Sequence, residues 1–361
     1  MTQTADQARF EPQRAEAFAT RLLGALNDGA LCLMVSIGHR TGLFDTMSRF
    51  RPATSAEIAT EAGLDERYVR EWLGAMVTSG VINYDPAGKR YTLPAENAAS
   101  LTRAAAADNM AVFAQYIGEL GSVEGDIVEC FHNGGGVPYE KFARFHEVMA
   151  EDSGQSVMSS LESHIVPLVP GLAERLESGI RVLDLGCGRG RILHRLATLY
   201  PRSRFVGIDL STDAIDYARR HAAGLTNLEY LARDLSDFDR TAEAEAFDFI
   251  TTFDAIHDQA QPLNVLTGIR RSLADGGVYL MQDISGTGHV HKDAEDPLGT
   301  LLYTVSCMHC MTVSLAQGGE GLGAMWGEEK TREYLAHAGF ASVIKKRLAH
   351  DIQNNWYIVQ N

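Results

Sequence analysis

Apolar and polar positions recur at helical spacing over the first eighty residues. Residues 15–42 carry apolar side chains three and four positions apart, which predicts one long helix. Two shorter helices follow, with Ser55 as the candidate cap of the first and Asp65 as the candidate cap of the second. Residues 81–84 and 90–93 then alternate as two short strands around an Asp-Pro-Ala-Gly turn. Helices followed by a hairpin are the order of a winged helix.

The helical pattern continues beyond this winged-helix domain, which we assign to residues 1–103. We interpret residues 104–178 as a helical connector and active-site cap. The Gly-Gly-Gly-Val-Pro run at residues 134–138 interrupts the pattern, because three glycines before a proline cannot continue a helix. A new helix is expected to begin near Tyr139. Its side chains at i, i+3, i+4 and i+7 are Phe142, Phe145, His146 and Met149.

From residue 179 the pattern changes to short apolar strands separated by helices of crossover length. Residues 285–328 interrupt this rhythm and are interpreted as a lid insertion. The last two strands are only a few residues apart, so they must pair antiparallel. The sequence therefore predicts an α/β fold, a seven-stranded Rossmann-like domain over residues 179–361 behind an α-rich winged helix. The expected strands are residues 180–185, 205–208, 228–231, 247–252, 278–283, 342–348 and 356–359.

Composition and charge narrow the class of protein. Of 361 residues, 45% are hydrophobic and 22% charged, which is typical of a globular chain and too apolar for disorder. The net charge of −15 repels phosphate backbones and anionic membrane surfaces, so neither nucleic acid nor membrane is an expected partner. Five scattered cysteines and a polar start without an apolar signal region predict a reduced, cytoplasmic protein.

A candidate nucleotide-binding turn follows the first strand of the second half. Asp184 and Leu185 lead into Gly186-x-Gly188-x-Gly190, where glycines let the backbone approach a ligand and permit positive φ. A dinucleotide-binding unit with GxGxxG is the rival interpretation. Further carboxylates favour S-adenosylmethionine: Asp184 for the methionine amine, Asp209 for the ribose hydroxyls and Asp234 for the adenine amine. Strand-end turn residues are the plain alternative. The neighbouring candidate cofactor contacts are Leu210, Leu235 and Phe253.

The fourth strand is followed by a histidine that is a candidate catalytic base. Ligands in open α/β sheets bind outside the carboxyl ends of the strands, which places His257 opposite the methyl group. An imidazole with an ordinary pKa of about 6.5 can accept a proton near neutrality. Asp258 is the candidate group that orients its ring. A capping or core histidine is the alternative interpretation.

Residues 180–361 resemble the class I S-adenosylmethionine-dependent methyltransferases. With the winged helix and the His-Asp pair, the chain is similar to two-domain small-molecule O-methyltransferases of plants and bacteria. The stretches 131–139 and 321–327 look closer still to bacterial, notably actinobacterial, members, some of which act on small thiols. The resemblance implies that His257 is the general base, that S-adenosylmethionine is converted to S-adenosylhomocysteine, and that the winged helix forms a homodimer. Gln259 stands where plant enzymes usually have tryptophan, which weakens the case for a phenolic acceptor.

The acceptor pocket is expected between the helix after Tyr139 and an apolar helical stretch after Pro297. Simple packing of this stretch as a lid is the alternative, and a zinc site at Cys307 and Cys310 is disfavoured because no second Cys/His pair has ligand spacing. No metal is expected. The candidate substrate-binding residues are Tyr139, His146, Tyr303, Cys307, His309 and Met311.

The function expected from this pattern is methylation of an oxygen or sulfur nucleophile of a small molecule, with a thiol or sulfide among the candidates. A winged-helix regulator that senses S-adenosylmethionine is the alternative from another class. Residues 40–96 weigh against DNA binding, because they hold seven basic and eight acidic residues with no basic face. A methyltransferase for RNA or protein is the third possibility. The candidate dimer contacts are Leu22, Leu26, Leu31, Met34 and Ile37.

Overall fold

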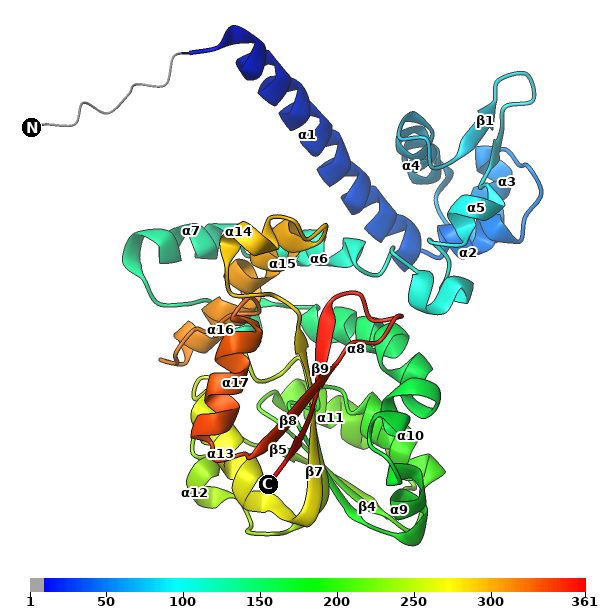
Figure 1. Ribbon diagram of the computed structural model, residues 1–361. Helices are drawn as coiled ribbons and strands as arrows, with labels where there is room; N and C mark the ends of the chain where they lie inside the picture. The colour runs from blue at the N-terminus through cyan, green and yellow to red at the C-terminus, as the bar shows by residue number, and fades with distance from the viewer. Residues whose placement is uncertain (1–9) are drawn as a thin grey trace, which may run out of the picture. The chain divides into compact units, whose positions relative to one another are not determined.

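The computed structural model describes residues 10–361, which form two compact units (Figure 1). One unit ends at Gly118, and the other runs from Glu119 to Asn361. The expected division at residues 103 and 178 stays a prediction. The fold class itself is confirmed, since a helical winged-helix unit precedes a seven-stranded α/β unit.

The first unit is helical apart from a two-stranded antiparallel sheet. The expected cap Ser55 is wrong by one residue. The cap is Thr54, whose hydroxyl accepts from the backbone N–H of Glu57 while the Glu57 carboxylate accepts from the Thr54 N–H. Asp65 caps the next helix as expected. The elements are α1 (Pro12–Arg40), α2 (Leu43–Ser48), α3 (Ser55–Ala62), α4 (Glu66–Thr78), β1 (Asn83–Asp85), β2 (Arg90–Thr92), α5 (Ala95–Ala98), the 3₁₀ turn Arg103–Asp108 and α6 (Ala114–Gly121).

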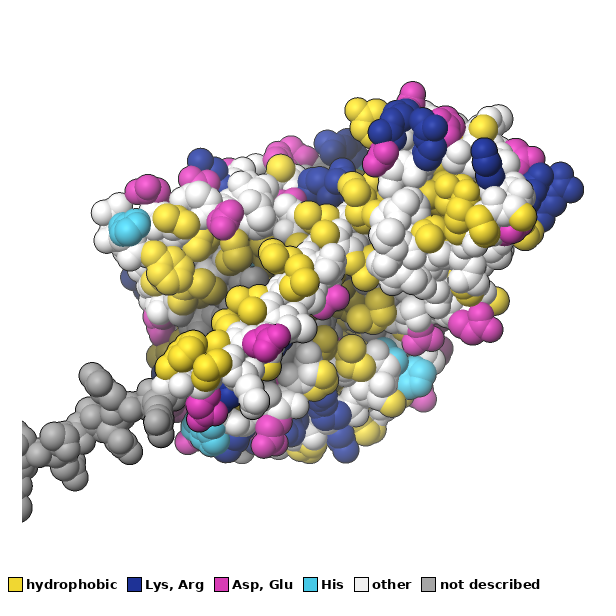
Figure 2. All heavy atoms as spheres, turned by 90° about the horizontal axis from the view of Figure 1, so that it is seen from above, with side chains coloured by type: hydrophobic (Ala, Val, Ile, Leu, Met, Phe, Trp, Pro, Cys, Tyr) yellow, Lys and Arg dark blue, Asp and Glu magenta, His cyan; other side chains and the backbone are white. Residues whose placement is uncertain are grey.

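Helix α1 buries only its C-terminal part within this unit. Leu31 and Met34, two of the candidate dimer contacts, pack partly buried against the core around Phe44 and Trp72. Figure 2 shows hydrophobic side chains gathered along the surface of the preceding turns. The exposed apolar side chains of α1 are Phe18, Leu22, Leu23, Leu26, Leu33 and Ile37.

The second unit is built on a sheet with strand order β5-β4-β3-β6-β7-β9-β8. The first five strands in this order are parallel, and β9 pairs antiparallel with both β7 and β8, as the spacing of the last two strands predicted. Chain order reverses between β3 and β6, so the crevice where ligands bind lies at their carboxyl ends. The strands are β3 (Arg181–Leu185), β4 (Arg204–Asp209), β5 (Leu228–Ala232), β6 (Phe247–Phe253), β7 (Leu273–Ile284), β8 (Ser342–Lys346) and β9 (Asn354–Gln360).

Helices cover both faces of this sheet and bury an apolar core on each (Figure 1). Trp356 and Val182 lie in the core of one face, and Tyr357 and Leu183 in that of the other, as the alternation along a strand requires. The first face is covered by α9 (Leu172–Ser178), α10 (Arg191–Leu199) and α11 (Thr212–His221), the second by α12 (Phe238–Thr241), α13 (Pro262–Ser272) and α17 (Gly327–His337).

The segment before the sheet differs from the expected single helix at Tyr139. Tyr139–Lys141 is a 3₁₀ turn, and Phe142 leaves the helical region at φ −92° and ψ 84°. A new helix starts three residues later, where the Glu119 carboxylate accepts from the backbone N–H of Arg144 at 2.8 Å. The elements here are α7 (Glu124–Asn133), α8 (Phe145–Ser156), the 3₁₀ turns Met158–Ser160 and Val166–Leu168, and the π-helical turn Leu161–Ile165 between them.

The insertion after β7 is helical. It holds α14 (Val290–Asp293), α15 (Gly299–Val305), the π-helical turn Ser306–Cys310 and α16 (Met311–Ala316). Pro12–Arg40 and Gly299–Ala316 are both long and apolar enough to cross a membrane by length and composition. The buried side chains of the second segment, Gly299–Ala316, favour a helix packed within the protein instead, which we call the lid helix. The expected absence of a membrane partner stays a prediction.

Candidate methyl-transfer site

The glycine-rich turn after β3 has one open side. Gly186, Gly188 and Gly190 have φ of 70°, 51° and 67°, in the region that favours glycine. A Cβ on Gly186 would lie 2.4 Å from the Ala255 methyl, and one on Gly190 would lie 2.4 Å from the Tyr230 ring. A Cβ on Gly188 would meet no atom of residues 10–361 within 4 Å. The turn therefore presents bare backbone to a ligand at Gly188.

Carboxylates stand at the ends of three neighbouring strands, as predicted. Asp184 is buried and accepts from the Thr251 hydroxyl at 2.8 Å. Burial raises the pKa of Asp184 to about 7, against the lowering effect of the Thr251 bond. Asp209 accepts from the backbone N–H of Gly188 and of Ser211, each at 2.8 Å, which holds it beside the turn. Asp234 is exposed.

The three apolar cofactor candidates lie in different surroundings. Leu210 is 47% exposed next to Asp209, so its side chain is available to a ligand. Phe253 is half-buried, with its ring edge-to-face on Trp356 at 6.1 Å. Leu235 packs in the core beneath α12 and α13, which leaves its backbone as the part that can face a cofactor.

His257 is oriented by a residue that the sequence did not indicate. Its Nδ1 lies 2.8 Å from Oδ1 of Asp283, at the end of the neighbouring strand β7. The same oxygen accepts from the Trp326 indole at 3.1 Å and from the Ile284 N–H at 2.9 Å. The expectation that Asp258 orients this ring is wrong. Asp258 accepts instead from the Gln259 side chain at 3.3 Å.

The Cys310 thiol is a second group that acts on the charge of the His257 ring, and the sequence did not indicate it either. Burial lowers the pKa of His257, but Asp283 and then Cys310 outweigh it and raise that pKa well above its ordinary value. Burial raises the pKa of Asp258 to about 7, although the nearby His257 lowers it. Burial and then Asp283 also raise the pKa of Asp254, on the same loop, well above its ordinary value, although His257 lowers it.

An aromatic cluster borders this histidine. The His309 ring stacks on Phe145 with centroids 3.3 Å apart, and the edges of Tyr139 and Phe142 meet it at 5.0 and 4.7 Å. His146 stacks on Tyr139 at 5.0 Å. The structure thus brings together Tyr139, His146 and His309, three of the six predicted substrate-binding residues.

His309 is almost fully buried, and neither ring nitrogen has a hydrogen-bond partner among residues 10–361. Burial, with His257 and His146 nearby, lowers its pKa well below the ordinary value, so the ring is neutral. Asp209 acts electrostatically on both Tyr139 and His146. The aromatic cluster is therefore within electrostatic reach of both Asp209 and His257.

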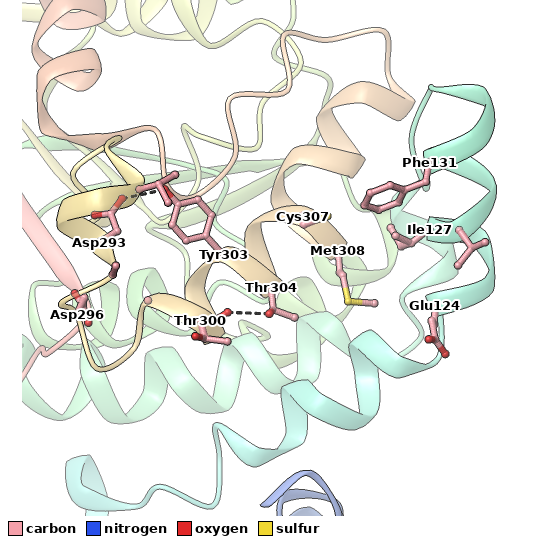
Figure 3. A pocket seen from close by; sticks show the side chains of 14 residues that line it. Glu124, Ile127, Phe131, Asp293, Asp296, Thr300, Tyr303, Thr304, Cys307 and Met308 are labelled. Carbon is pink, nitrogen blue, oxygen red and sulfur yellow. Dashed lines mark hydrogen bonds between the residues drawn. The ribbon is translucent and has the colours of Figure 1, made fainter. Parts of the chain in front are cut away.

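Of the remaining substrate candidates, Tyr303 and Cys307 do not join this cluster. Tyr303 and Cys307 line a separate pocket of about 620 Å³ on the outer side of the lid helix, facing Ile127 and Phe131 of α7 (Figure 3). The Tyr303 hydroxyl donates to Asp293 at 3.0 Å. Met311 packs near Gly323. Among residues 10–361 no three His, Cys, Asp or Glu side chains gather as metal ligands.

Family models match two parts of the chain. Residues 176–339 match a methyltransferase domain, and residues 29–103 match an Rv2258c-like winged HTH domain. A ubiquinone biosynthesis O-methyltransferase of Actinobacillus pleuropneumoniae is 34% identical over 114 residues, which are 30% of this chain and 47% of the relative. A fatty-acid O-methyltransferase of Mycolicibacterium smegmatis is 32% identical over 29% of this chain and 37% of its own. The chain matches less than half the length of these curated relatives.

Solved structures show the same fold over nearly the whole chain. Human N-acetylserotonin methyltransferase, in complex with S-adenosylmethionine, has a TM-score of 0.66 at 17% identity and covers 100% of this chain and 99% of its own. The mitomycin 7-O-methyltransferase MmcR has a TM-score of 0.68 at 16% identity and covers 97% and 100%.

Residues 176–339 therefore match a methyltransferase domain, and they contain the parallel strands and the open glycine turn described above. They follow residues that match an Rv2258c-like winged HTH domain, and the chain as a whole has the fold of the two solved methyltransferases. The residues present fit S-adenosylmethionine. The bare backbone at Gly188 and the carboxylates of Asp184 and Asp209 would hold its methionine and ribose parts.

Proposed function

We propose that this protein transfers the methyl group of S-adenosylmethionine to an oxygen of a small molecule, with His257 as general base. The observation that carries the proposal is the buried His257–Asp283 pair at 2.8 Å beside the donor turn. A phenol or alcohol is mostly protonated at neutrality, so an oriented base is what such an acceptor needs. A thiol is partly ionised already and needs the base less, so it is the alternative acceptor class.

The mechanism divides between residues that align and residues that move a proton. When bound, the sulfonium of S-adenosylmethionine supplies an already activated methyl group. Gly188 and Asp209 hold the donor, while the aromatic cluster around His309 excludes water from the acceptor. His257 accepts the proton of the nucleophile, and Asp283 stabilises the resulting imidazolium through Nδ1.

The decisive experiment combines binding with turnover. Calorimetry should show S-adenosylmethionine binding to the full chain, and a panel of phenols, carboxylic acids and thiols with labelled donor should identify the accepted class. Labelled phenol products support an oxygen acceptor that needs a base. Labelled carboxylic acids alone would support an oxygen acceptor but contradict the need for a base, since a carboxylate is already ionised at neutrality, and labelled thiols alone move the proposal to sulfur. Absence of donor binding would refute the proposal as a whole.

A role as a DNA-binding regulator finds no support in the winged helix. The two arginines of the candidate recognition helix α4 are engaged by its own acids, Arg67 by Glu71 and Arg70 by Glu66. Without a free basic face the helix lacks the charge that holds a phosphate backbone. We therefore propose a cytoplasmic enzyme that uses this domain for assembly.

The assembly we propose is a homodimer through the exposed apolar face of α1. Phe18, Leu22 and Leu26 are exposed at one- to two-turn spacing, and such contiguous apolar surface marks interfaces. Replacing Leu22 and Leu26 together with aspartate should convert a dimer to a monomer in sedimentation analysis. A double variant that still sediments as a dimer contradicts this assignment.

A further inference from the structure

His309 is a polar side chain buried in apolar surroundings. It is 1% exposed, and neither ring nitrogen has a hydrogen-bond partner among residues 10–361. A buried polar group without a partner loses the hydrogen bonds that it made to water, so such groups are rare in folded proteins. An apolar side chain would fill the same space without this loss. Packing alone therefore does not explain an imidazole here.

The side chains around His309 are aromatic. Phe145 covers one face of the imidazole, with centroids 3.3 Å apart and planes 8° from parallel. The rings of Phe142 and Tyr139 stand steeply to it, at 75° and 88°. An N–H over a ring face makes only a weak hydrogen bond. Burial lowers the pKa of His309 well below its ordinary value, so the ring is neutral, with one donor and one acceptor nitrogen.

The turn that carries His309 packs beside the proposed base. The Gly323 N–H donates to the carbonyl oxygen of His257 at 3.2 Å. A Cβ on Gly323 would lie 2.5 Å from the Ser306 hydroxyl and 3.3 Å from Cβ of Met311. Ser306 begins the π-helical turn that contains His309, and Met311 follows it. The turn and His257 thus contact the same glycine residue.

The ring that stacks on His309 is tied in turn to the donor side. Phe145 is the first residue of α8, and the carbonyl of Ala150 in the same helix accepts from the Arg191 guanidinium. Arg191 is the first residue of α10, directly after the glycine-rich turn. The stack of His309 on Phe145 therefore joins a turn that packs beside the base to a helix that packs beside the donor turn.

The aromatic cluster is closed at His309 and partly open at its other end. Tyr139 and His146 stack on one another at 5.0 Å and are half-buried, so this end of the cluster reaches solvent. Phe142 and Phe145 are each only 4% exposed. A small molecule that enters at the open end can bring a polar group to the nitrogens of His309.

We propose that His309 is a specificity-determining residue, which binds a hydroxyl or carbonyl group of the acceptor other than the oxygen that is methylated. The inference rests on the proposed function, because it needs an acceptor held at His257. A neutral imidazole can donate to a carbonyl or accept from a hydroxyl. A buried site built for a polar group rejects analogues that lack it, because its own atoms stay unpaired. The acceptor class is then a small molecule with two oxygen groups, one methylated and one bound.

The first test needs no acceptor. His309→Phe and the smaller His309→Leu both remove the two buried nitrogens, so at least one of them should raise the Tm of the full chain by about 2 °C or more. Scanning calorimetry measures this change. A Tm at or below that of the wild type in both variants would overturn the proposal, because it would show that the nitrogens are bound within the free protein.

The second test compares probes that differ by one hydroxyl. Phenol, catechol, resorcinol and hydroquinone would be titrated by NMR into the full chain loaded with S-adenosylhomocysteine. The wild type should bind at least one diol about three- to tenfold more tightly than phenol, the range that one net hydrogen bond supplies. His309→Phe should bring this preference below about twofold and leave the affinity for phenol unchanged. An equal preference in wild type and His309→Phe, or none in the wild type, would overturn the proposal.

Two further variants separate hydrogen bonding from packing. His309→Asn keeps a donor and an acceptor at this position and should retain part of the preference for a diol. The matched control is Phe145→Leu, which changes the ring stacked on His309 and should weaken all four probes alike. A loss of preference in Phe145→Leu equal to that in His309→Phe would show a packing role and overturn the proposal. Failure of the proposed function appears separately, as absence of methyl transfer by the wild type.

Discussion

The donor and acceptor sides of the methyltransferase domain are built from different parts. The donor side uses backbone turns and carboxylates from three successive βα units, such as Gly188 beside Asp209. The acceptor side gathers side chains from segments far apart in the chain, among them Tyr139, His257, Asp283 and Cys310. The first side can be read from local sequence, and the second exists only after folding.

The two sides also differ in how open they are. At the donor side Gly188 borders free space and Leu210 is exposed, so a ligand can enter a preformed cradle. At the acceptor side His257, His309 and Cys310 are buried against one another. We therefore expect donor binding to need little rearrangement and acceptor binding to need movement of the helical segment that covers His257. Substitutions should separate the two sides cleanly.

The largest effect is expected for His257→Ala. General-base help is typically worth 10²–10⁴-fold, so kcat on an oxygen acceptor should fall by more than about a hundredfold. Donor affinity by calorimetry should stay unchanged, because the variant touches only the acceptor side. A loss below about tenfold indicates a thiol acceptor, and full activity at every pH removes His257 from the mechanism.

The pH profile sharpens the same prediction. A base must be neutral to accept a proton, and Asp283 and Cys310 outweigh burial to raise the pKa of His257 well above its ordinary value. Activity should therefore rise with pH through that raised pKa and fall below it, with the acid limb above about pH 6.5. Partial rescue of His257→Ala at high pH would follow from ionisation of the acceptor itself.

The next effect compares the two candidate partners of this histidine. Asp283→Asn replaces the carboxylate 2.8 Å from Nδ1 and loses a hydrogen bond to a charged group, worth about 1.5–3 kcal/mol, so kcat should fall about 10- to 100-fold. Asp258→Asn keeps the observed Gln259 contact and should change kcat less than about threefold. An equal loss of kcat in the two variants would indicate that Asp258 also orients the His257 ring.

The sequence indicates Asp258, and not Asp283, as the carboxylate that orients His257, and the reason is physical. Asp258 adjoins the histidine in the chain, whereas Asp283 ends an apolar strand and meets His257 only because β6 and β7 are neighbours in the sheet. The sequence signal that points to Asp283 is that it is the single acidic residue at the end of the otherwise uncharged run 278–284. The strands, the donor turn and the final antiparallel pair were predictable, because their patterns are local.

The lid shows a second limit. The pattern of residues 297–315 predicts an apolar helix. In a regular α-helix the period of 3.6 residues determines which side chains share a face. The π-helical turn Ser306–Cys310 adds a residue and changes that phase. Cys310 is buried and close enough to His257 to act on its charge, while Cys307, the predicted contact, lines the outer pocket.

On the donor side, Asp209→Ala should weaken S-adenosylmethionine binding by about tenfold, since unpaired ribose hydroxyls cost about 1–3 kcal/mol. The loss also frees the Gly188 and Ser211 amides that Asp209 now holds. Asp234→Ala is the matched control at the exposed end of the next strand and should have a smaller effect. Unchanged calorimetric affinity in Asp209→Ala would contradict the donor assignment.

The smallest effect concerns the pH dependence of donor binding. Burial raises the pKa of Asp184 to about 7, so this carboxyl is mostly ionised at about pH 8 and mostly protonated at about pH 6. The ionised form accepts from the methionine ammonium, so donor affinity should fall up to about tenfold between these two values. Calorimetry in buffers of different ionisation enthalpy should detect release of about half a proton on binding at about pH 7.

Two variants on the same hydrogen bond test whether Asp184 is the group responsible. Asp184→Asn should bind the donor weakly, with no comparable fall in affinity between these pH values. Thr251→Val removes the 2.8 Å hydrogen bond that lowers the Asp184 pKa, so the fall in affinity should begin at higher pH. An unshifted profile in Thr251→Val, or wild-type affinity that is the same at both pH values, would show that this buried carboxylate does not meet the donor.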